Sequence, residues 1–468
     1  MMLDQDSYDI QEGSYQSDTL ELIMVYGRRR VGKTTLLMQF CEAKKSIFHV
    51  TTSTNPHRIL QDLARDINSE IETGKLQFDT FQDVLDTIDT LSKRERLIVV
   101  FDEFPIMAKT LESSMGDLQR YIDFHKENKN LTIVLCGSSL SFMKHQIEDY
   151  QSPLYGRKTA KLFIQPFTLN QSHELLPHLS LEELLQVYAV CGGIAQYLLA
   201  FSSNTPIKDQ IKSLFLQPQG ILSNEAIQLL QMEVKDVGTY REVMEQVANG
   251  VNQSNKIADK THKSPAVVSM ALANLEALEL ARKEKPIGNT TRRGHWMITD
   301  PLFAFYFRFV SPFIGLLDRG ATAGPYAYFE KNYQQYLGFA FEHVCANHLF
   351  TQPYPFIKAG KWWGPNPVKK QEEEIAIMAV ELDGTAHFGA CKWTSEHIDS
   401  AVLDTLMKRS YLAEPNNAHE YWLYAKSGFC KALLDRSKQD KTLHLISLED
   451  LFLPIPSFCE KPDNQGEF

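Results

Sequence analysis

The sequence has few of the features that mark membrane-spanning, secreted or zinc-binding proteins. Its seven cysteines among 468 residues form no Cys-x-x-Cys pair, which argues against structural zinc and favours a reducing compartment. The most apolar stretch, residues 302–317, contains Arg308 and Pro312 and is too short and broken to span a bilayer. The first residues are acidic and polar, unlike a secretory signal peptide. We therefore expect a cytoplasmic protein without a membrane partner.

The chain also lacks an excess of positive charge. Its 48 Lys and Arg residues are outnumbered by 58 Asp and Glu, which gives a net charge of −10. This balance argues against indiscriminate polyanion binding, so any nucleic-acid contact must come from a local basic surface. Hydrophobic content of 43% and charged content of 23% are typical of globular proteins. The length predicts about three domains of ~150 residues each.

The chain does contain a phosphate-binding loop. Residues 27–34 spell GxxxxGKT and directly follow the apolar run 22–26. Between a buried strand and a helix, such a loop points backbone N–H groups at phosphate oxygens, and the helix adds its positive end. Lys33 is expected to reach the β- and γ-phosphates, and the Thr34 hydroxyl to coordinate Mg²⁺. The predicted nucleotide-binding residues are Gly27, Arg28, Arg29, Arg30, Val31, Gly32, Lys33, Thr34 and Thr35.

Two acidic residues follow a second apolar run, residues 97–101. Asp102 is predicted to hold Mg²⁺ through water. Glu103 is predicted to orient and polarise the attacking water, because phosphoryl transfer depends more on positioning than on covalent chemistry. Together with the loop, these acids predict a site for a nucleoside triphosphate and Mg²⁺.

Two further residues are candidates for the same site. Ser138 follows the apolar run 131–136, and its hydroxyl can sense the γ-phosphate; a plain turn is the alternative. Arg157 can supply a cation to the transition state; an ordinary surface arginine is the alternative.

The first predicted domain covers residues 1–225. Its apolar strands alternate with helical stretches, which indicates an α/β fold with a parallel sheet and helices on both faces. Residues 169–201 are expected to form a helical lid over the nucleotide.

The second predicted domain, residues 226–318, is a winged helix-turn-helix. Three helical stretches precede two strands around a glycine-rich turn, residues 288–294. Residues 240–317 contain ten Lys and Arg against seven Asp and Glu, a balance of +3, so this is the locally basic part of the chain. The side chains expected to contact DNA phosphates are Lys256, Lys260, Lys263, Arg292 and Arg293. A protein–protein spacer is the alternative.

The third predicted domain covers residues 325–468. An amphipathic helix through residues 338–350 is followed by Trp362-Trp363, a polar loop, and strands at 374–380 and 387–393. A helix at 400–411 and a strand at 421–424 come next. The order helix–strand–strand–helix–strand is that of a restriction-endonuclease-like α/β core.

Seven motifs follow one another along the chain, at residues 27–34, 102–104, 137–139, 154–157, 300–301, 338–342 and 391–393. With these motifs in this order, the chain resembles the archaeal-type ATPases of the STAND class of P-loop proteins, in which a winged helix and a PD-(D/E)xK nuclease-like domain follow the ATPase. The resemblance implies ATP binding, a DNA endonuclease and an association with mobile elements or genome defence. The usual segment before the first strand is not recognisable, so the adenine contacts stay unassigned.

The nuclease pattern is incomplete in this chain. Such a site needs two carboxylates that hold Mg²⁺ and a lysine that positions water. Glu342 and Lys392 are present, but Ala376 and Ala390 stand where the resemblance implies Asp and Glu. Alanine has no oxygen to hold a metal, so we expect cleavage by this chain to be absent or very weak.

Because both replacements are alanine, our hypothesis is an engineered inactive form of an ATP-regulated, Mg²⁺-dependent DNA endonuclease. A naturally inactive domain that only binds DNA is the alternative to engineering. At the level of function, the alternative is a nucleotide-switched scaffold or sensor that binds DNA or protein. An oligomeric translocase has less support, because no pore loop is recognisable, and a homo-oligomer is left open.

Overall fold

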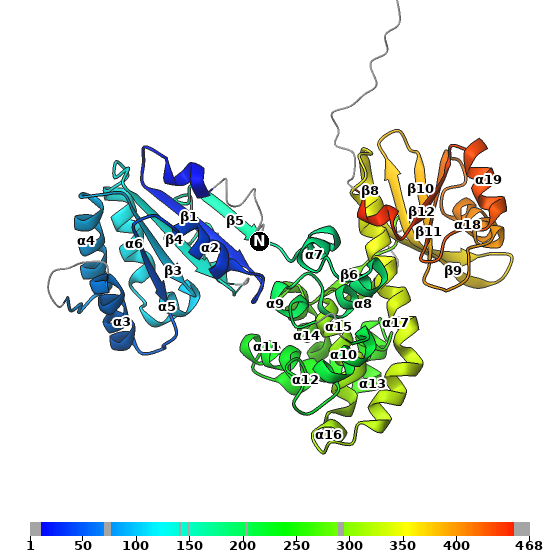
Figure 1. Ribbon diagram of the computed structural model, residues 1–468, viewed down its shortest axis with the longest axis horizontal. Coiled ribbons are helices and arrows are strands. Elements are labelled where there is room, and N and C mark those ends of the chain that lie inside the picture. The colour runs from blue at the N-terminus through cyan, green and yellow to red at the C-terminus, as the bar shows by residue number, and fades with distance from the viewer. Residues whose placement is uncertain are drawn as a thin grey trace, which may run out of the picture. The chain divides into compact units, whose positions relative to one another are not determined.

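The chain folds into two units, each with its own five-stranded sheet (Figure 1). The computed structural model describes residues 11–69, 76–139, 142–147, 149–201, 205–288 and 294–453. Unit 1 comprises Met1–Phe167 with Ile194–Gln196, and unit 2 comprises Thr168–Gly193 with Tyr197–Phe468. No helix in the described ranges is both long and apolar enough to cross a membrane.

Unit 1 contains a wholly parallel sheet with the strand order β2-β3-β4-β1-β5. Every residue of β1, β3 and β4 is buried, as expected for central parallel strands whose two faces are covered by helices. The carboxyl ends of these strands lie at one edge of the sheet. The strands are β1 (Glu21–Gly27), β2 (Ser46–Val50), β3 (Leu97–Asp102), β4 (Leu131–Gly137) and β5 (Ala160–Ile164).

Helices connect these strands and cover the sheet. Their apolar faces join the sheet in one core, to which α3 and α4 each contribute four or more buried side chains. The helical elements of unit 1 are α2 (Lys33–Cys41), α3 (Pro56–Ser69), α4 (Phe81–Ser92), α5 (Phe104–Thr110), α6 (Ser114–Phe124) and the π-helical turn η1 (Phe142–Ile147). The predicted P-loop α/β fold is confirmed.

The segment predicted to form a lid belongs mostly to unit 2. Helix α8 packs on α15 and α17, and the Tyr336 hydroxyl donates a hydrogen bond of 2.7 Å to the Ala189 carbonyl. The helices in this part of the chain are α7 (Leu169–Leu175), α8 (Leu181–Cys191), α9 (Ala195–Leu198), α10 (Ile207–Phe215) and α11 (Glu225–Glu233).

Three helices and a hairpin follow, in the order expected of a winged helix. Helices α12, α13 and α14 contact one another, and β6 pairs antiparallel with β7. The wing residues 289–293, with Arg292 and Arg293, lie outside the described residues. The elements are α12 (Val237–Ala248), α13 (Ser254–Thr261), α14 (Pro265–Ala277), β6 (Ala281–Glu284), β7 (His295–Ile298), α15 (Pro301–Phe305), η2 (Tyr306–Val310), η3 (Ser311–Phe313) and α16 (Ile314–Leu317).

The C-terminal sheet has the order β12-β11-β10-β9-β8. Strands β8, β9 and β10 are antiparallel neighbours, whereas β10, β11 and β12 are parallel. The sequence analysis missed β8, because its apolar residues are interrupted by lysines and glycines as is common for an edge strand. The elements are α17 (Ala323–Phe350), β8 (Phe356–Asn366), β9 (Gln371–Glu381), β10 (Ala386–Lys392), α18 (Ser400–Ala413), β11 (His419–Ala425), α19 (Lys431–Gln439), β12 (Leu443–Ser447) and η4 (Asp450–Phe452).

The β6–β7 hairpin is anchored on β8 at the end of the hairpin that leads into its loop. The Ile287 amide donates to the Lys361 carbonyl at 2.9 Å, and the Ile287 side chain belongs to the core of the C-terminal sheet. The His295 and Trp363 rings stack with centroids 4.5 Å apart. The hairpin therefore holds the three-helix segment and the C-terminal sheet together within unit 2.

Gly27, at the end of β1, has no room for a side chain. A Cβ there would lie 2.3 Å from the backbone oxygen of Ile164 in β5. We predict that Gly27→Ala destabilises the protein by about 1–3 kcal/mol, the usual cost of overpacking. Gly116→Ala is the control, because nothing lies within 4 Å of its added Cβ on α6 and alanine favours a helix. Thermal unfolding checks the pair, and equal midpoints for the two variants would contradict the prediction.

Candidate functional site

The predicted phosphate-binding loop joins β1 to α2. Gly32 has a φ of 102° and Arg30 a φ of 67°, so the loop turns through left-handed backbone twice before the helix begins. The Lys33 ammonium donates to the carbonyls of Gly27 at 2.9 Å and Arg28 at 2.8 Å. Lys33 thus lies across the loop, where an incoming phosphate would replace these carbonyls as its partner.

The Lys33 ammonium is buried, with 7% of the residue exposed. Burial lowers its pKa below the usual value, although Cys136, Glu103 and Asp102 favour the charged form. A buried ammonium group attracts phosphate oxygens strongly, because its low-dielectric surroundings strengthen the interaction between opposite charges.

Thr34, in the first turn of α2, lies next to Asp102, the last residue of β3. The Thr34 hydroxyl donates to a carboxylate oxygen of Asp102 at 2.7 Å, and Asp102 is only 4% exposed. A hydroxyl and a carboxylate are oxygen donors of the kind that Mg²⁺ prefers. The residues present therefore fit a magnesium ion bound with a nucleotide.

The Glu103 carboxylate contacts Ser138, which follows β4, and Arg29 of the phosphate-binding loop. Glu103 has a φ of 53° at the beginning of α5, and the Ser138 hydroxyl lies 2.8 and 3.0 Å from its two carboxylate oxygens. Arg29 approaches the same carboxylate, with Nη1 3.8 Å from Oε1. Ser138 therefore contacts Glu103, the residue predicted to orient water.

Arg157 does not join this group. Its guanidinium forms two hydrogen bonds to Asp123 of α6, at 2.8 and 2.7 Å, and donates to the carbonyls of Pro153 and Tyr155. Of the other predicted loop residues, Val31 is buried, whereas Arg30 and Thr35 are exposed.

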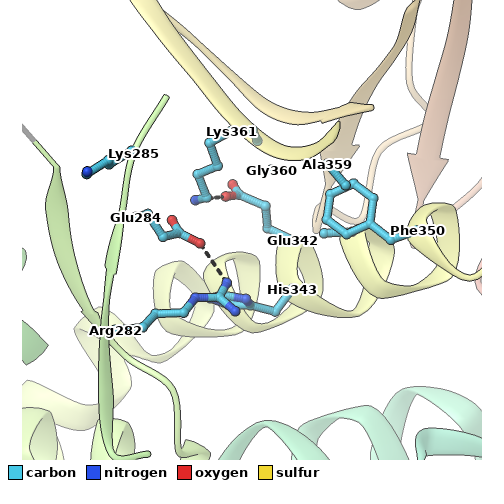
Figure 2. Close-up of a pocket in the computed structure, with 11 residues that line it drawn as sticks. Arg282, Glu284, Lys285, Glu342, His343, Phe350, Ala359, Gly360 and Lys361 are labelled. Carbon is cyan, nitrogen blue, oxygen red and sulfur yellow. Dashed lines mark hydrogen bonds and ion pairs between the residues drawn. The ribbon is translucent and has the colours of Figure 1, made fainter. Parts of the chain in front are cut away.

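Unit 2 contains a second candidate site, a cavity of about 330 Å³. Figure 2 shows that residues of the β6 hairpin, α17 and β8 surround it. Glu342 and Ala376, both predicted for the nuclease pattern, line it together. The lining residues are Arg282, Glu284, Lys285, Glu342, His343, Ala346, Phe350, Ala359, Gly360, Lys361 and Ala376.

A β-bulge turns Ala376 towards this cavity. Gly360 pairs with Met378 and Trp362 pairs with Ile375, so a single residue of β8 faces two of β9. Such a bulge interrupts the alternation of side chains. Ile375 and Met378 both belong to the core on the α18 side, which leaves Ala376 on the side of Glu342.

Ala390 and Lys392 do not line the cavity. Ala390 packs against the same core as Phe388, two residues before it on β10, while the neighbouring Cys391 contacts Cys345 of α17. Lys392 is exposed. The nuclease roles predicted for these residues stay predictions.

Lys361 was not singled out in the sequence, yet it lines the cavity. Its ammonium forms an ion pair with Glu342 at 2.5 Å (Figure 2). Burial lowers its pKa, but Glu342, Glu284 and Glu374 outweigh burial and raise it. No motif marks this lysine, because its place depends on the pairing of β8 with β9.

The basic residues predicted to contact DNA are only partly described. Lys256 and Lys260 of α13 are exposed, whereas Lys263 forms an ion pair with Glu242 at 3.1 Å. Two lysines on one helix are a small basic surface.

We expect His343 to make the stability of unit 2 depend on pH. Burial, with help from Lys361 and Arg282, lowers its pKa from 6.5 to about 4. The unfolded chain therefore binds more protons between pH 4 and 6.5, so stability should fall as the pH drops through this range. We predict that His343→Gln weakens this dependence and that His397→Gln, at an exposed position, does not. Melting temperatures from pH 4 to 7.5 test this, and parallel curves for wild type and His343→Gln would contradict it.

Comparisons with known proteins agree with this architecture. Residues 10–201 match the family described as "ATPase domain predominantly from Archaea", and residues 306–403 match "Archaea bacterial proteins of unknown function". The uncharacterized protein MJECL04 of Methanocaldococcus jannaschii is 28% identical over 386 residues, which are 81% of this chain and 84% of that protein.

Solved structures with partial similarity include a Walker-type ATPase and an ORC2 protein. The Walker-type ATPase paby2304 of Pyrococcus abyssi is 19% identical, with a TM-score of 0.48 over 65% of this chain and 96% of that chain. The Aeropyrum pernix ORC2 protein in ADPNP–ADP complexes is 14% identical, with a TM-score of 0.45 over 68% and 93%. Residues 10–201 are thus similar to an archaeal-type ATPase domain, and residues 27–34 within them have the geometry of a phosphate-binding loop.

Proposed function

We propose that this protein hydrolyses ATP in unit 1 and uses the nucleotide to control DNA handling by unit 2. The observation that carries the first half is the hydrogen bond between Thr34 and Asp102 beside the buried Lys33. The cation proposed to bind phosphate, the proposed magnesium ligands and the proposed base therefore lie together at one edge of the sheet. Phosphoryl transfer depends on such positioning.

Each residue has a defined role in the proposed reaction. Lys33 exchanges its carbonyl partners for β- and γ-phosphate oxygens. Thr34 and Asp102 would hold Mg²⁺, which would neutralise phosphate charge. Glu103 accepts a hydrogen bond from the attacking water. The water oxygen bonds to the γ-phosphorus, the bond to the bridging oxygen breaks, and its electron pair stays with ADP. The water proton passes to Glu103 and then to solvent.

Substitution of Lys33 and Glu103 separates binding from turnover. Lys33→Ala should abolish nucleotide binding, because it removes the buried phosphate partner. Glu103→Gln should keep binding but slow hydrolysis by about 100-fold or more, the range for loss of a general base. Calorimetry and phosphate release measure the two effects. Unchanged turnover in Glu103→Gln would mean that another group activates water, and undiminished ATP binding by Lys33→Ala would contradict the proposed site.

DNA is the proposed partner of unit 2. Lys256 and Lys260, both exposed on one helix of the three-helix segment, support contact with DNA phosphates. The alternative, a nucleotide-switched scaffold or sensor that binds protein, would not require these lysines to contact phosphate.

A second candidate function is metal-dependent DNA cleavage. It would belong to a parent sequence that has an aspartate at position 376 and a glutamate at position 390, where this chain has alanines. Its support is the cavity that Glu342 and Ala376 line together. A carboxylate at 376 would face Glu342, and two facing carboxylates are a magnesium site. The hypothesis that both alanines were engineered is tested by reading the codons in the natural gene.

Restoring the acids tests this second function. We predict that Ala376→Asp with Ala390→Glu cleaves DNA in the presence of Mg²⁺, while the unaltered chain does not. The matched control adds Glu342→Gln to the restored variant and should lose the activity, because one of the two facing carboxylates is gone. Gel assays on linear, supercoiled and branched DNA read the outcome. No cleavage of any form would favour the scaffold.

A further inference from the structure

Arg29 extends from the phosphate-binding loop towards the residue that activates water. Its Nη1 lies 3.8 Å from Oε1 of Glu103, and the two side chains are 35% and 23% exposed. Arg29 is therefore close to the residue proposed to activate water.

The guanidinium of Arg29 is incompletely paired. Its Nε is buried and has no hydrogen-bond partner among the described residues, and the distance to Glu103 exceeds that of a good hydrogen bond. A buried N–H without a partner is unfavourable, so such a group gains from an incoming acceptor. Phosphate oxygens are suitable acceptors, because a guanidinium presents a rigid fork of donors to them.

The other arginine considered for this role is already bound. Arg157 gives both of its strongest hydrogen bonds to Asp123 and two more to backbone carbonyls. To reach a phosphate it would have to leave all four acceptors, whereas Arg29 would give up one long ion pair.

We propose that Arg29 acts in cis as the arginine that stabilises charge on the γ-phosphoryl group during hydrolysis. This rests on the proposed ATPase activity. As the water oxygen bonds to phosphorus and the bond to ADP breaks, Arg29 donates hydrogen bonds to a γ-oxygen. It neither gives nor takes a proton, because a guanidinium stays charged.

The same geometry couples substrate to the activation of water. Arg29 and the Ser138 hydroxyl both approach Oε1 of Glu103, at 3.8 and 2.8 Å. A γ-phosphate competes with Glu103 for Arg29, and its capture of the guanidinium removes the ion pair from the carboxylate that accepts the water proton.

The test compares Arg29→Ala with Arg120→Ala, a control on α6 whose side chain is 63% exposed. We expect Arg29→Ala to lower kcat by about 100-fold or more, as for arginines that act on the transition state. ATP affinity should change by less than about 3-fold, since Lys33 and the loop amides remain. Arg29→Ala should also fail to trap ADP with aluminium fluoride, and added guanidinium chloride, at concentrations too low to unfold the protein, should restore part of the rate. Arg120→Ala should resemble wild type.

Each alternative outcome is decisive. If Arg29→Ala keeps wild-type turnover, or if guanidinium fails to rescue a folded variant, the inference is wrong. If Arg29→Ala does not fold, Arg29→Lys and Arg29→Gln replace it, and equal kcat in wild type and Arg29→Gln would overturn the role. A wild-type protein that binds ATP but never hydrolyses it would instead overturn the proposed function, and with it this role.

Discussion

The hydrogen bond between Thr34 and Asp102 ties the phosphate-binding loop to the centre of the sheet in unit 1. It joins the first turn of α2 to the last residue of β3, and β4 separates β3 from β1 in the sheet. The bond can form only because the three strands are parallel and in register, so that their carboxyl ends reach the same edge. Lys33, Glu103 and Ser138 are positioned by the same edge, and the nucleotide chemistry proposed for this protein depends on it.

In unit 2 the corresponding constraint is the β6–β7 hairpin anchored on β8. One backbone hydrogen bond from Ile287 and the stacking of His295 on Trp363 join elements that are far apart in the sequence. This junction brings Arg282 and Glu284 to a cavity that α17, β8 and β9 would otherwise leave open on that side. Both acids that line the cavity form ion pairs, Glu342 with Lys361 and Glu284 with Arg282. Lys285 is a third cation in the lining, so cations outnumber acids there.

Much of unit 1 could be predicted because its signals are local. An apolar run followed by a glycine-rich loop or by acids specifies a buried strand and what lies at its end, as for Lys33, Asp102 and Glu103. The edge strand β8 gave no such signal, since lysines and glycines interrupt its apolar residues. Lys361 was missed with it. The lid segment was recognised as helical, but its assignment to unit 2 depends on packing against α15 and α17, which helical periodicity does not encode.

The sequence by itself determined the phosphate-binding loop, the acids that face it and the parallel sheet that carries them, because strand, loop and helix follow one another within a few residues. Tertiary structure alone decided which charged groups meet. It paired Arg157 with Asp123, placed Arg29 near Glu103, and brought Ala376 into the lining of the cavity with Glu342. The physical reason is that the partner of a side chain depends on strand register and on packing between segments distant in the chain, neither of which a local pattern records.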